Sequence, residues 1–311
     1  MNMKLAMVFP GQGSQAVGML KGYEGLPELA AVRKEIEEVL GREFLTLLDE
    51  GPAERLNQTV NTQPAMVAAG YAAYRAWRAL GGPQPELVAG HSLGEYTALV
   101  AAGALAFRDC LPLVRFRAQA MQEAVPEGQG AMAAILGIDE NEVEAACAGA
   151  GGVVQAVNFN APGQVVIAGE TSAVARAVEA CKARGAKRAL PLPVSAPFHS
   201  SLMRPAAIRL GEFLQNIGFS RPKIDLINNV DVKTESDPAA IKAALVRQAY
   251  SPVRWVETIR RMAELGATHI VECGPGKVLS GFTKRIAAQT QSFALADRAA
   301  LEQAVQALQG T

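Results

Sequence analysis

The segment Gly90-His91-Ser92-Leu93-Gly94 places a serine between two glycines, where a predicted strand, Glu86–Ala89, gives way to a helical pattern that starts at Glu95. A strand, a sharp turn and a helix in this order form a nucleophile elbow. Its strained turn needs neighbours without side chains, and the helix N-terminus supplies N–H groups that can stabilise an oxyanion. Taken alone, the segment also fits a tight turn that merely contains a serine.

Strand and helix patterns alternate on both sides of this segment. Lys4–Phe9 is a predicted strand, and Pro27–Leu40, Pro64–Leu80 and Glu95–Ala106 have helical periodicity. Further along the chain we predict helices at Pro205–Asn216, Pro238–Gln248 and Val253–Leu265, and strands at Ile224–Val230 and His269–Glu272. This alternation predicts an α/β domain with a mainly parallel sheet covered by helices.

The middle of the chain follows another order. It reads strand Ala131–Gly137, helix Glu140–Ala148, strands Val153–Asn158 and Gln164–Ala168, helix Ser172–Arg184 and strand Lys187–Pro193. This βαββαβ order is typical of a ferredoxin-like unit. We therefore predict a large discontinuous domain, residues 1–125 and 198–311, with an inserted ferredoxin-like subdomain at 126–197.

The composition excludes several classes of protein. The 311 residues include 30 basic and 30 acidic side chains, so no overall charge favours nucleic acid or a membrane surface. The four cysteines form no CxxC pair and the three histidines do not cluster, which argues against metal sites and disulfides. Met1–Phe9 is too short for a signal peptide, and Thr97–Ala106 is too short to cross a bilayer. We expect a cytoplasmic protein without metal or cofactor.

An elbow serine needs a base, and histidine is the usual choice. His91 is adjacent to Ser92 and points elsewhere, whereas His269 opens a predicted buried strand and fits a structural role. His199 lies in the loop Ser195–Ser200, where the inserted unit rejoins the large domain. We favour His199 as the base over a packing role, because catalytic groups are often held on such loops.

The acid that orients the histidine in α/β hydrolases is missing. No Asp or Glu in a clear strand-end loop stands between Ser92 and His199. Either a backbone carbonyl orients the imidazole, or the mechanism differs from ordinary hydrolysis.

The predicted helix Leu111–Val125 contains two arginines that point in nearly opposite directions. Arg117 projects from an apolar stripe, whereas Arg115 is flanked by glutamines. A guanidinium in an apolar stripe needs an anion, which is either an internal carboxylate or the carboxylate of a substrate.

Two glycine-rich loops resemble nucleotide motifs only formally. Gly11–Ala16 fits GxGxxG/A, but helical sequence occupies the place of the second strand that the dinucleotide fold requires. A backbone N–H of this loop could instead complete an oxyanion hole. Gly274–Lys277 lacks the spacing of a P-loop and is better interpreted as a turn before a helix.

Taken together, these segments resemble the malonyl-CoA:acyl carrier protein transacylases, the stand-alone acyltransferases of bacterial fatty-acid synthesis. The resemblance covers nearly the whole chain and is specific because its motifs occur in a fixed order. They are Phe9-Pro10-Gly11-Gln12-Gly13-Ser14-Gln15, Thr62-Gln63-Pro64-Ala65, Gly90-His91-Ser92-Leu93-Gly94-Glu95-Tyr96, Gln122-Glu123-Ala124-Val125-Pro126, Val157-Asn158-Phe159-Asn160, Pro197-Phe198-His199-Ser200 and Gly274-Pro275-Gly276-Lys277.

The resemblance implies that Ser92 is acylated and that His199 is its general base and acid. It also implies that the N–H groups of Gln12 and Leu93 form the oxyanion hole, and that Arg117 binds the malonyl carboxylate.

Two further residues receive roles from the resemblance. The main-chain carbonyl of Gln248 would orient His199, and Phe198 matches a malonyl-selecting rather than a methylmalonyl-selecting pattern. The chain departs from the family at Ala118, where glycine is frequent, and at Cys273 before the Gly-Pro-Gly turn. Ala118 could alter helix packing near Arg117.

We therefore expect a ping-pong transfer of malonyl from malonyl-CoA to the phosphopantetheine thiol of acyl carrier protein, releasing coenzyme A. Alternatives are an acyltransferase serving a polyketide synthase, a serine thioesterase, and a non-enzymatic nucleotide-binding protein. Lys187 and Arg188, in a basic cluster with Lys182 and Arg184, are candidates for carrier docking. The cluster also fits a solvated turn, and Lys277, Lys284 and Arg285 form an alternative patch.

Overall fold

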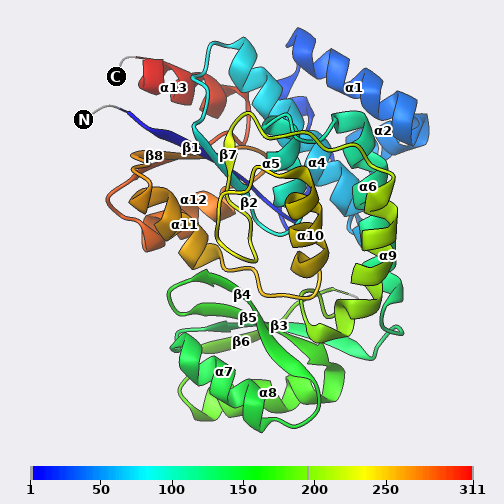
Figure 1. Ribbon diagram of the computed structural model, residues 1–311, viewed down its shortest axis with the longest axis vertical. Coiled ribbons are helices and arrows are strands. Elements are labelled where there is room, and N and C mark those ends of the chain that lie inside the picture. Colours follow the sequence, from blue (N-terminus) through cyan, green and yellow to red (C-terminus); the bar gives the residue numbers. More distant parts are fainter. Residues whose placement is uncertain (1–2, 195, 310–311) are drawn as a thin grey trace.

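The computed structural model describes residues 3–194 and 196–309. The strands form a five-stranded and a four-stranded sheet. Figure 1 shows the smaller sheet at one end of the molecule, with the larger sheet and most helices at the other. The predicted fold class, an α/β unit with a mainly parallel sheet and a ferredoxin-like unit, is confirmed. The division at residues 126 and 198 stays a prediction.

The large sheet is parallel throughout and has the order β7-β2-β1-β8-β9. Its strands are β1 (Leu5–Phe9), β2 (Leu87–Gly90), β7 (Asp225–Leu226), β8 (His269–Glu272) and β9 (Gln291–Ala294). Residues of β1, β2 and β8 are buried throughout, as expected where helices cover both faces of a sheet. The loops after these three strands leave the same edge of the sheet, where ligands bind in open α/β folds.

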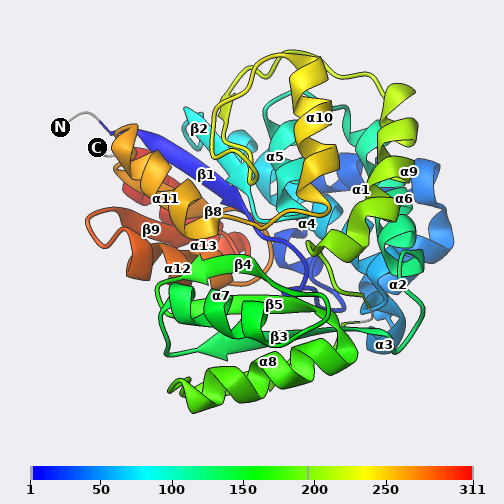
Figure 2. The same ribbon diagram turned by 60° about the horizontal axis from the view of Figure 1, so that its bottom comes forward.

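The helices of the large unit pack on both faces of this sheet. They are α1 (Pro27–Leu40), α2 (Arg42–Glu50), α3 (Ala53–Leu56), α4 (Thr59–Ala79), α5 (Gly94–Ala101), α6 (Phe107–Glu123), α9 (Arg204–Gln215), α10 (Pro238–Gln248), α11 (Trp255–Glu264), α12 (Val278–Ile286) and α13 (Arg298–Gln309), with short 3-10 turns at Lys21–Tyr23 and Ser201–Met203. Figure 2 shows β1 between α11 on one side and α4 and α5 on the other.

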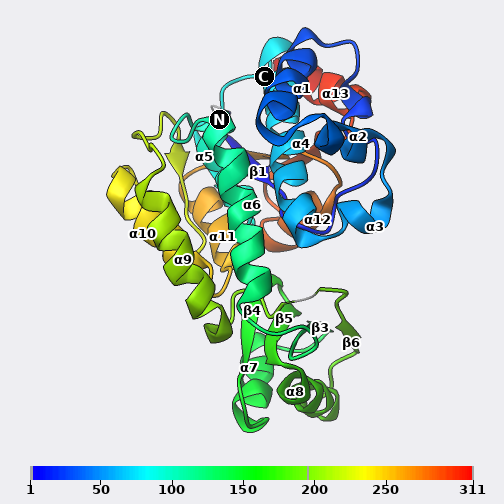
Figure 3. The same ribbon diagram turned by 90° about the vertical axis from the view of Figure 1, so that its right-hand side faces the viewer.

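Alternation along β1 builds the two cores. Leu5, Met7 and Phe9 point into a core shared with α4, α5 and α6. Ala6 and Val8 point into a second core shared with α11 and α12. Successive strand residues face opposite sides, so one short strand supports both layers. In Figure 3, α6 lies between α4 and α9 and points toward the small sheet.

The small sheet is antiparallel and has the order β4-β5-β3-β6. It is built from β3 (Gly130–Leu136), α7 (Glu140–Gly149), β4 (Val154–Ala161), β5 (Gln164–Glu170), α8 (Thr171–Ala183) and β6 (Arg188–Pro191). One face packs on α7 and α8, and the other carries Met132, Val157, Val166 and Ala168. Val253 joins the units, because its N–H donates to the Val157 carbonyl (2.8 Å) and its carbonyl accepts from the Phe159 N–H (3.0 Å).

Helices α4 and α5 and strand β7 differ most from their predicted bounds. Helix α4 begins at Thr59 and contains Pro64 in its interior, although proline favours the first turn. Helix α5 ends at Ala101, because Gly103 has φ 70° and the Ala104 N–H donates back to the Leu99 carbonyl in a Schellman-type cap. The chain leaves the sheet after the two residues of β7, and Asn228 and Asn229 become turn and site residues.

Elements α2, α3, β9 and α13 were not anticipated from the sequence. Among the described residues, no helix is sufficiently long and apolar to traverse a lipid bilayer.

Candidate active site

Ser92 stands on a strained turn between β2 and α5. Its φ is 51°, in the left-handed region that few residues other than glycine adopt. A Cβ on Gly90 would lie 1.8 Å from the Gly94 carbonyl carbon, and one on Gly94 would lie 2.0 Å from the Phe9 carbonyl oxygen. The two glycines are therefore required by the close approach of the turn to β1 and to its own helix.

His199 lies within hydrogen-bond distance of the serine. Its Nε2 is 2.7 Å from Ser92 Oγ, and its Nδ1 is 2.8 Å from the carbonyl oxygen of Gln248. Because a carbonyl can only accept, Nδ1 carries the hydrogen and Nε2 accepts from the Ser92 hydroxyl. His199 is 4 % exposed. Burial, and then the charge of Arg117, lower the pKa of His199 to about 3. The imidazole is thus neutral near pH 7, as a proton acceptor must be.

Arg117 is 2 % exposed and reaches the same serine from α6. Its Nη1 donates to Gln63 Oε1 (2.9 Å), and its Nη2 donates to Gln248 Oε1 (3.1 Å) and Ser92 Oγ (3.3 Å). Its guanidinium carbon lies 5.3 Å from the centre of the Tyr96 ring.

No Asp or Glu of the described residues forms an ion pair with Arg117. Its partners are neutral oxygens, and burial lowers its pKa. A buried cation without a paired anion is costly, so the site favours an anionic ligand.

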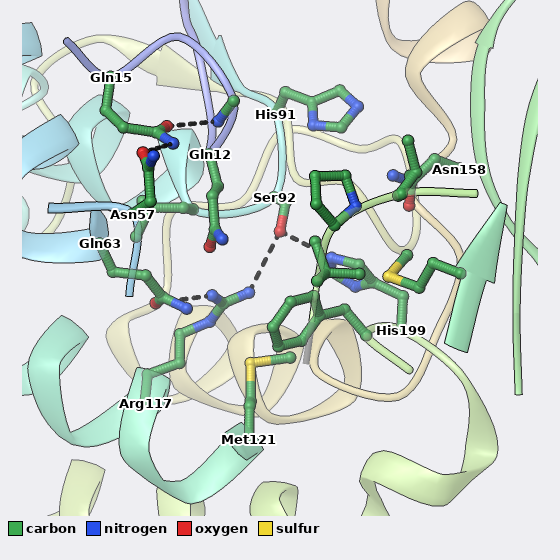
Figure 4. Close-up of a pocket in the computed structure, with 17 residues that line it drawn as sticks. Gln12, Gln15, Asn57, Gln63, His91, Ser92, Arg117, Met121, Asn158 and His199 are labelled. Carbon is green, nitrogen blue, oxygen red and sulfur yellow. Dashed lines mark hydrogen bonds between the residues drawn. The ribbon is translucent and has the colours of Figure 1, made fainter. Parts of the chain in front are cut away.

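Gln12 and Leu93 lie in two neighbouring loops. Gln12 follows β1 and Leu93 precedes α5, and a Cβ on Gly11 would lie 2.6 Å from the His91 carbonyl oxygen, so the loops are in contact. Within residues 3–194 and 196–309, neither N–H donates to a protein acceptor. Figure 4 shows Gln12, Ser92 and Arg117 around one space.

That space is a cavity of about 470 Å³ between the two sheets. Ser92, His199 and Arg117 form its polar end, and the small sheet contributes Met132 and Asn158. The remaining lining residues include the apolar side chains of Met121, Leu192, Pro193, Val194 and Phe198 and the polar side chains of Gln12, Gln15, Asn57, Gln63 and His91. An adjoining hollow of about 840 Å³ shares the lining residues Gln12, Asn57, Pro193 and Val194 with it.

Glu95 and Asn229 belong to the site and were not proposed from the sequence. Asn229 Oδ1 accepts from the Ser92 N–H (2.8 Å), and its Nδ2 donates to the Gly90 carbonyl (2.8 Å). Glu95 Oε2 accepts from the Asn229 N–H (3.0 Å) and from Gln248 Nε2 (2.9 Å). A usable signal existed, because Glu95 directly follows the elbow and Asn229 lies in a predicted parallel strand close to its carboxyl end.

The other two histidines lie away from the Ser92 hydroxyl. His91 Nε2 is 2.7 Å from Asn160 Oδ1, and its ring contacts Trp255 edge-on with 5.3 Å between ring centres. His269 is buried in β8, with Nδ1 2.8 Å from Thr268 Oγ1. Neither is positioned to take the serine proton. In the part of the chain that the structure describes, no group of three or more His, Cys, Asp or Glu could hold a metal ion.

The remaining candidate residues lie at the surface. Arg188 is exposed at the start of the edge strand β6, and Lys187 is exposed directly before it; neither forms an ion pair among the described residues. Lys182 and Arg184 pair instead with Glu179 and Glu142. The segment after β6 leads to Leu192–Val194 on the cavity wall; Ser195 lies outside the described residues. Arg285 donates to Gln164 Oε1 and the Pro162 carbonyl, and Gly274–Lys277 is a turn before α12.

Comparisons with known proteins identify the family of this arrangement. A family model described as the acyl transferase domain matches residues 6–303. A malonyl CoA-acyl carrier protein transacylase of Salmonella typhimurium is 52 % identical over 305 residues, covering 97 % of this chain and 99 % of the relative. The protein of the same name from Bacillus subtilis is 45 % identical, covering 98 % and 97 %.

Two solved structures are similar over nearly their whole length. The acyl-carrier-protein S-malonyltransferase of Burkholderia pseudomallei has a TM-score of 0.96 and 59 % identity, covering 98 % of this chain and 100 % of the other. A malonyl-transacylase in complex with a type II PKS acyl-carrier protein has a TM-score of 0.96 and 50 % identity, covering 98 % and 99 %.

Proposed function

The chain belongs to the acyl transferase family, and on this premise we propose that it transfers malonyl from malonyl-CoA to the phosphopantetheine thiol of an acyl carrier protein. The observation that carries the proposal is the contact of Ser92 Oγ with both His199 Nε2 (2.7 Å) and the buried Arg117 (3.3 Å). A nucleophile with its base, beside a cation without an ion-pair partner among the described residues, suits an acyl group that ends in a carboxylate.

The first half-reaction loads Ser92. His199 Nε2 takes the hydroxyl proton while Ser92 Oγ attacks the thioester carbonyl of malonyl-CoA. The oxyanion that forms is stabilised by the N–H groups of Gln12 and Leu93. The carbon–sulfur bond then breaks, coenzyme A leaves with the proton from His199, and malonyl-Ser92 remains.

The Gln248 carbonyl replaces the acid of the hydrolase triad. By accepting from Nδ1–H it holds the imidazole in the tautomer that leaves Nε2 free as a base. A neutral carbonyl stabilises the imidazolium less than a carboxylate does, and the hydrogen bond from Gln248 only partly opposes the lowering of the His199 pKa by burial and by Arg117.

The second half-reaction runs in reverse with a different thiol. The phosphopantetheine thiol of the carrier loses its proton to His199 and attacks malonyl-Ser92, and the serine leaves as a protonated hydroxyl. Water competes for the same intermediate. Arg117, bound to the malonyl carboxylate through its Nη atoms, favours the thiol by fixing the acyl group for attack. Phe198 lines the cavity next to His199 and limits the room for a branched acyl group.

The carrier docks at the basic edge of the small sheet, where β6 begins. The acidic carrier would meet Lys187 and Arg188 and direct its phosphopantetheine arm along Leu192–Val194 into the cavity. The protein works in the cytoplasm. The reaction needs no metal or cofactor, because the chain's own residues supply the base, the oxyanion donors and the anion site.

A polyketide carrier is a second candidate partner, because one similar structure is a malonyl-transacylase bound to a type II PKS carrier. The chemistry is the same, so only the preferred carrier differs. Comparing transfer rates to fatty-acid and polyketide carriers in the phosphopantetheine form separates the two functions.

Intact-protein mass spectrometry tests the proposed function. Malonyl-CoA alone should add one malonyl group to the wild-type chain and none to Ser92→Ala, and carrier protein should then remove the group and acquire it. Release of free malonate from malonyl-CoA alone, at the rate at which coenzyme A appears, would identify a thioesterase instead.

A further inference from the structure

Glu95 is a buried carboxyl directly beneath the serine turn. It lies in the first turn of α5 and is 1 % exposed. No Lys, Arg or His of the described residues forms an ion pair with it. Burying a carboxyl without an ion pair is unfavourable, so its hydrogen bonds must serve something that the fold or the site requires.

Both partners of Glu95 hold parts of the site. Asn229 donates its N–H to Glu95 Oε2 (3.0 Å). Its side-chain amide holds the serine turn, because Oδ1 accepts from the Ser92 N–H and Nδ2 donates to the Gly90 carbonyl. Gln248 donates Nε2–H to the same Oε2 (2.9 Å) and to the Ser92 carbonyl (3.0 Å). One carboxyl oxygen thus connects the clamp on the nucleophile with the residue that orients the base.

The carboxylate, together with the Ser92 carbonyl, fixes which way the Gln248 amide faces. A carboxylate can only accept, so the NH₂ group must point to Glu95 and the amide oxygen must point away. That oxygen accepts from Arg117 Nη2 at 3.1 Å. In the flipped orientation the NH₂ group would face the guanidinium, donor against donor, and Arg117 would lose this anchor.

We propose that Glu95, as a carboxylate, is a positioning residue for malonyl transfer: it locks the Gln248 amide and thereby sets Arg117 and His199 relative to Ser92. The inference rests on the proposed function of Ser92 and adds a residue to it.

The ionisation of Glu95 falls within a testable range of pH. Burial raises its pKa to about 7, while hydrogen bonds from Asn229 and Gln248 and the charge of Arg117 oppose the rise and Asp231 adds to it. A proton on the carboxyl weakens the acceptor, so loading should slow as pH falls through about 7. His199, whose pKa is lowered to about 3, does not titrate in this range, and burial lowers the pKa of His91 as well.

The test compares Glu95→Gln with Glu272→Gln. Glu272 is a matched control because it is 0 % exposed in β8, accepts a backbone N–H from Ser280 (2.7 Å), and has a pKa raised by burial. Among the described residues it has no hydrogen bond with Asn229 or Gln248, the two partners of Glu95. For each chain, single-turnover loading with malonyl-CoA and acetyl-CoA is measured from pH 5.5 to 8.5, with kcat and KM for both donors.

Glu95→Gln should load malonyl about 10- to 100-fold more slowly at pH 8, the equivalent of one charge-assisted hydrogen bond. Its loading rate should no longer fall at low pH as the wild-type rate does, and it should lose part of the preference for malonyl over acetyl. Glu272→Gln should keep both the wild-type fall in loading rate at low pH and the wild-type preference for malonyl over acetyl. The proposal would be overturned if Glu95→Gln loaded malonyl at the wild-type rate, kept the fall in loading rate at low pH, and kept the wild-type preference for malonyl over acetyl.

If Glu95→Gln does not fold, the wild-type profile decides. Carbon-13 NMR of the labelled glutamate carboxyls then locates the titration of Glu95 in the wild-type chain. A loading rate that falls with this titration while circular dichroism is constant supports the proposal, and a loading rate that stays constant through it overturns the proposal. Failure of the wild-type chain to load at all would count against the proposed function instead.

Discussion

Both residues of the proposed proton transfer have left-handed backbone conformations. Ser92 has φ 51° and His199 has φ 65°, although neither is glycine. Such conformations cost about 1–3 kcal/mol each and persist only where the surroundings determine them. At Ser92 the surroundings are two glycines and the Asn229 clamp. At His199 they include the Gln248 carbonyl. Strain at both positions fits a site whose geometry is set before substrate binds.

Removing the nucleophile or the base should nearly abolish loading. We expect Ser92→Ala to form no malonyl adduct and His199→Ala to load at least about 10⁴-fold more slowly, by analogy with other activated serines. Rapid-quench mass spectrometry measures both rates. His269→Ala is the matched control and should change the unfolding free energy rather than loading. Labelling of Ser92→Ala at the wild-type level would contradict the assignment.

Arg117→Ala should change which acyl group is preferred. Without the guanidinium a malonyl carboxylate is buried without a partner, a penalty of about 2–5 kcal/mol, whereas acetyl has no such charge. The ratio of kcat/KM for malonyl-CoA and acetyl-CoA measures the change, and acetyl should become the preferred group. Arg115→Ala is the control, because Arg115 packs over Phe44, 5.2 Å from its ring centre. Equal losses for both donors would make Arg117 a structural residue.

At the scale of elements, the cavity depends on where strands end rather than on how long they are. The loops after β1 and β2 meet at one edge of the sheet, and β7 delivers Asn229 to that edge although it has only two residues. The small sheet closes the cavity from the opposite side with Met132 and Asn158. The short strands β1 and β2 suffice here because both are buried between the helices on the two faces of the large sheet.

The edge strand β6 gives a prediction about the carrier. Lys187→Glu with Arg188→Glu should raise KM for the carrier and reduce its dependence on ionic strength, because exposed charges at an interface act mainly on association. Loading from malonyl-CoA should remain almost unchanged.

The control is the pair Lys284→Glu with Arg285→Glu on α12, the alternative basic patch. Steady-state transfer to carrier between 20 and about 300 mM salt reports the difference, a range over which screening changes strongly. Unaltered carrier kinetics at low salt would remove β6 from the docking surface, and a loss confined to the α12 variant would move docking there.

For the whole molecule, the buried carboxyl of Glu95 links activity to stability. Its pKa in the folded chain, about 7, is above the ordinary value of 4.5. The stability that this group contributes is complete below pH 4.5 and is lost as pH rises through about 7. His199 has the opposite sign, because its lowered pKa contributes stability above pH 6.5 that is lost as pH falls toward 3.

Urea denaturation of Glu95→Gln and the wild-type chain at pH 5 and pH 8 should reveal the Glu95 contribution. The unfolding free energy of the wild type relative to the variant should fall by about 3 kcal/mol between these pH values, since 1 pKa unit corresponds to about 1.4 kcal/mol. A pH-independent difference between the two chains would show that Glu95 keeps an ordinary pKa.

The sequence by itself determined most of the elements, because their signals are local. Alternation and helical periodicity predicted both units, with α1, α10 and β8 correct at both ends. It also singled out Ser92, His199 and Arg117 through their local settings, and Gln248 through resemblance. The structure brings these four residues into contact, while their catalytic roles stay predictions.

Only the tertiary structure decided how these residues are held. The hydrogen bonds of Glu95 with Asn229 and Gln248 join positions 134 and 153 residues apart. No local pattern specifies such a pair, because sheet order and the docking of loops bring the residues together. The same holds for the hydrogen-bond partners of Arg117, which are neutral oxygens. The sequence left open whether an internal carboxylate or the carboxylate of a substrate pairs with this residue. Local free energies select strands and helices, whereas a buried polar network exists only once distant segments have packed and excluded water.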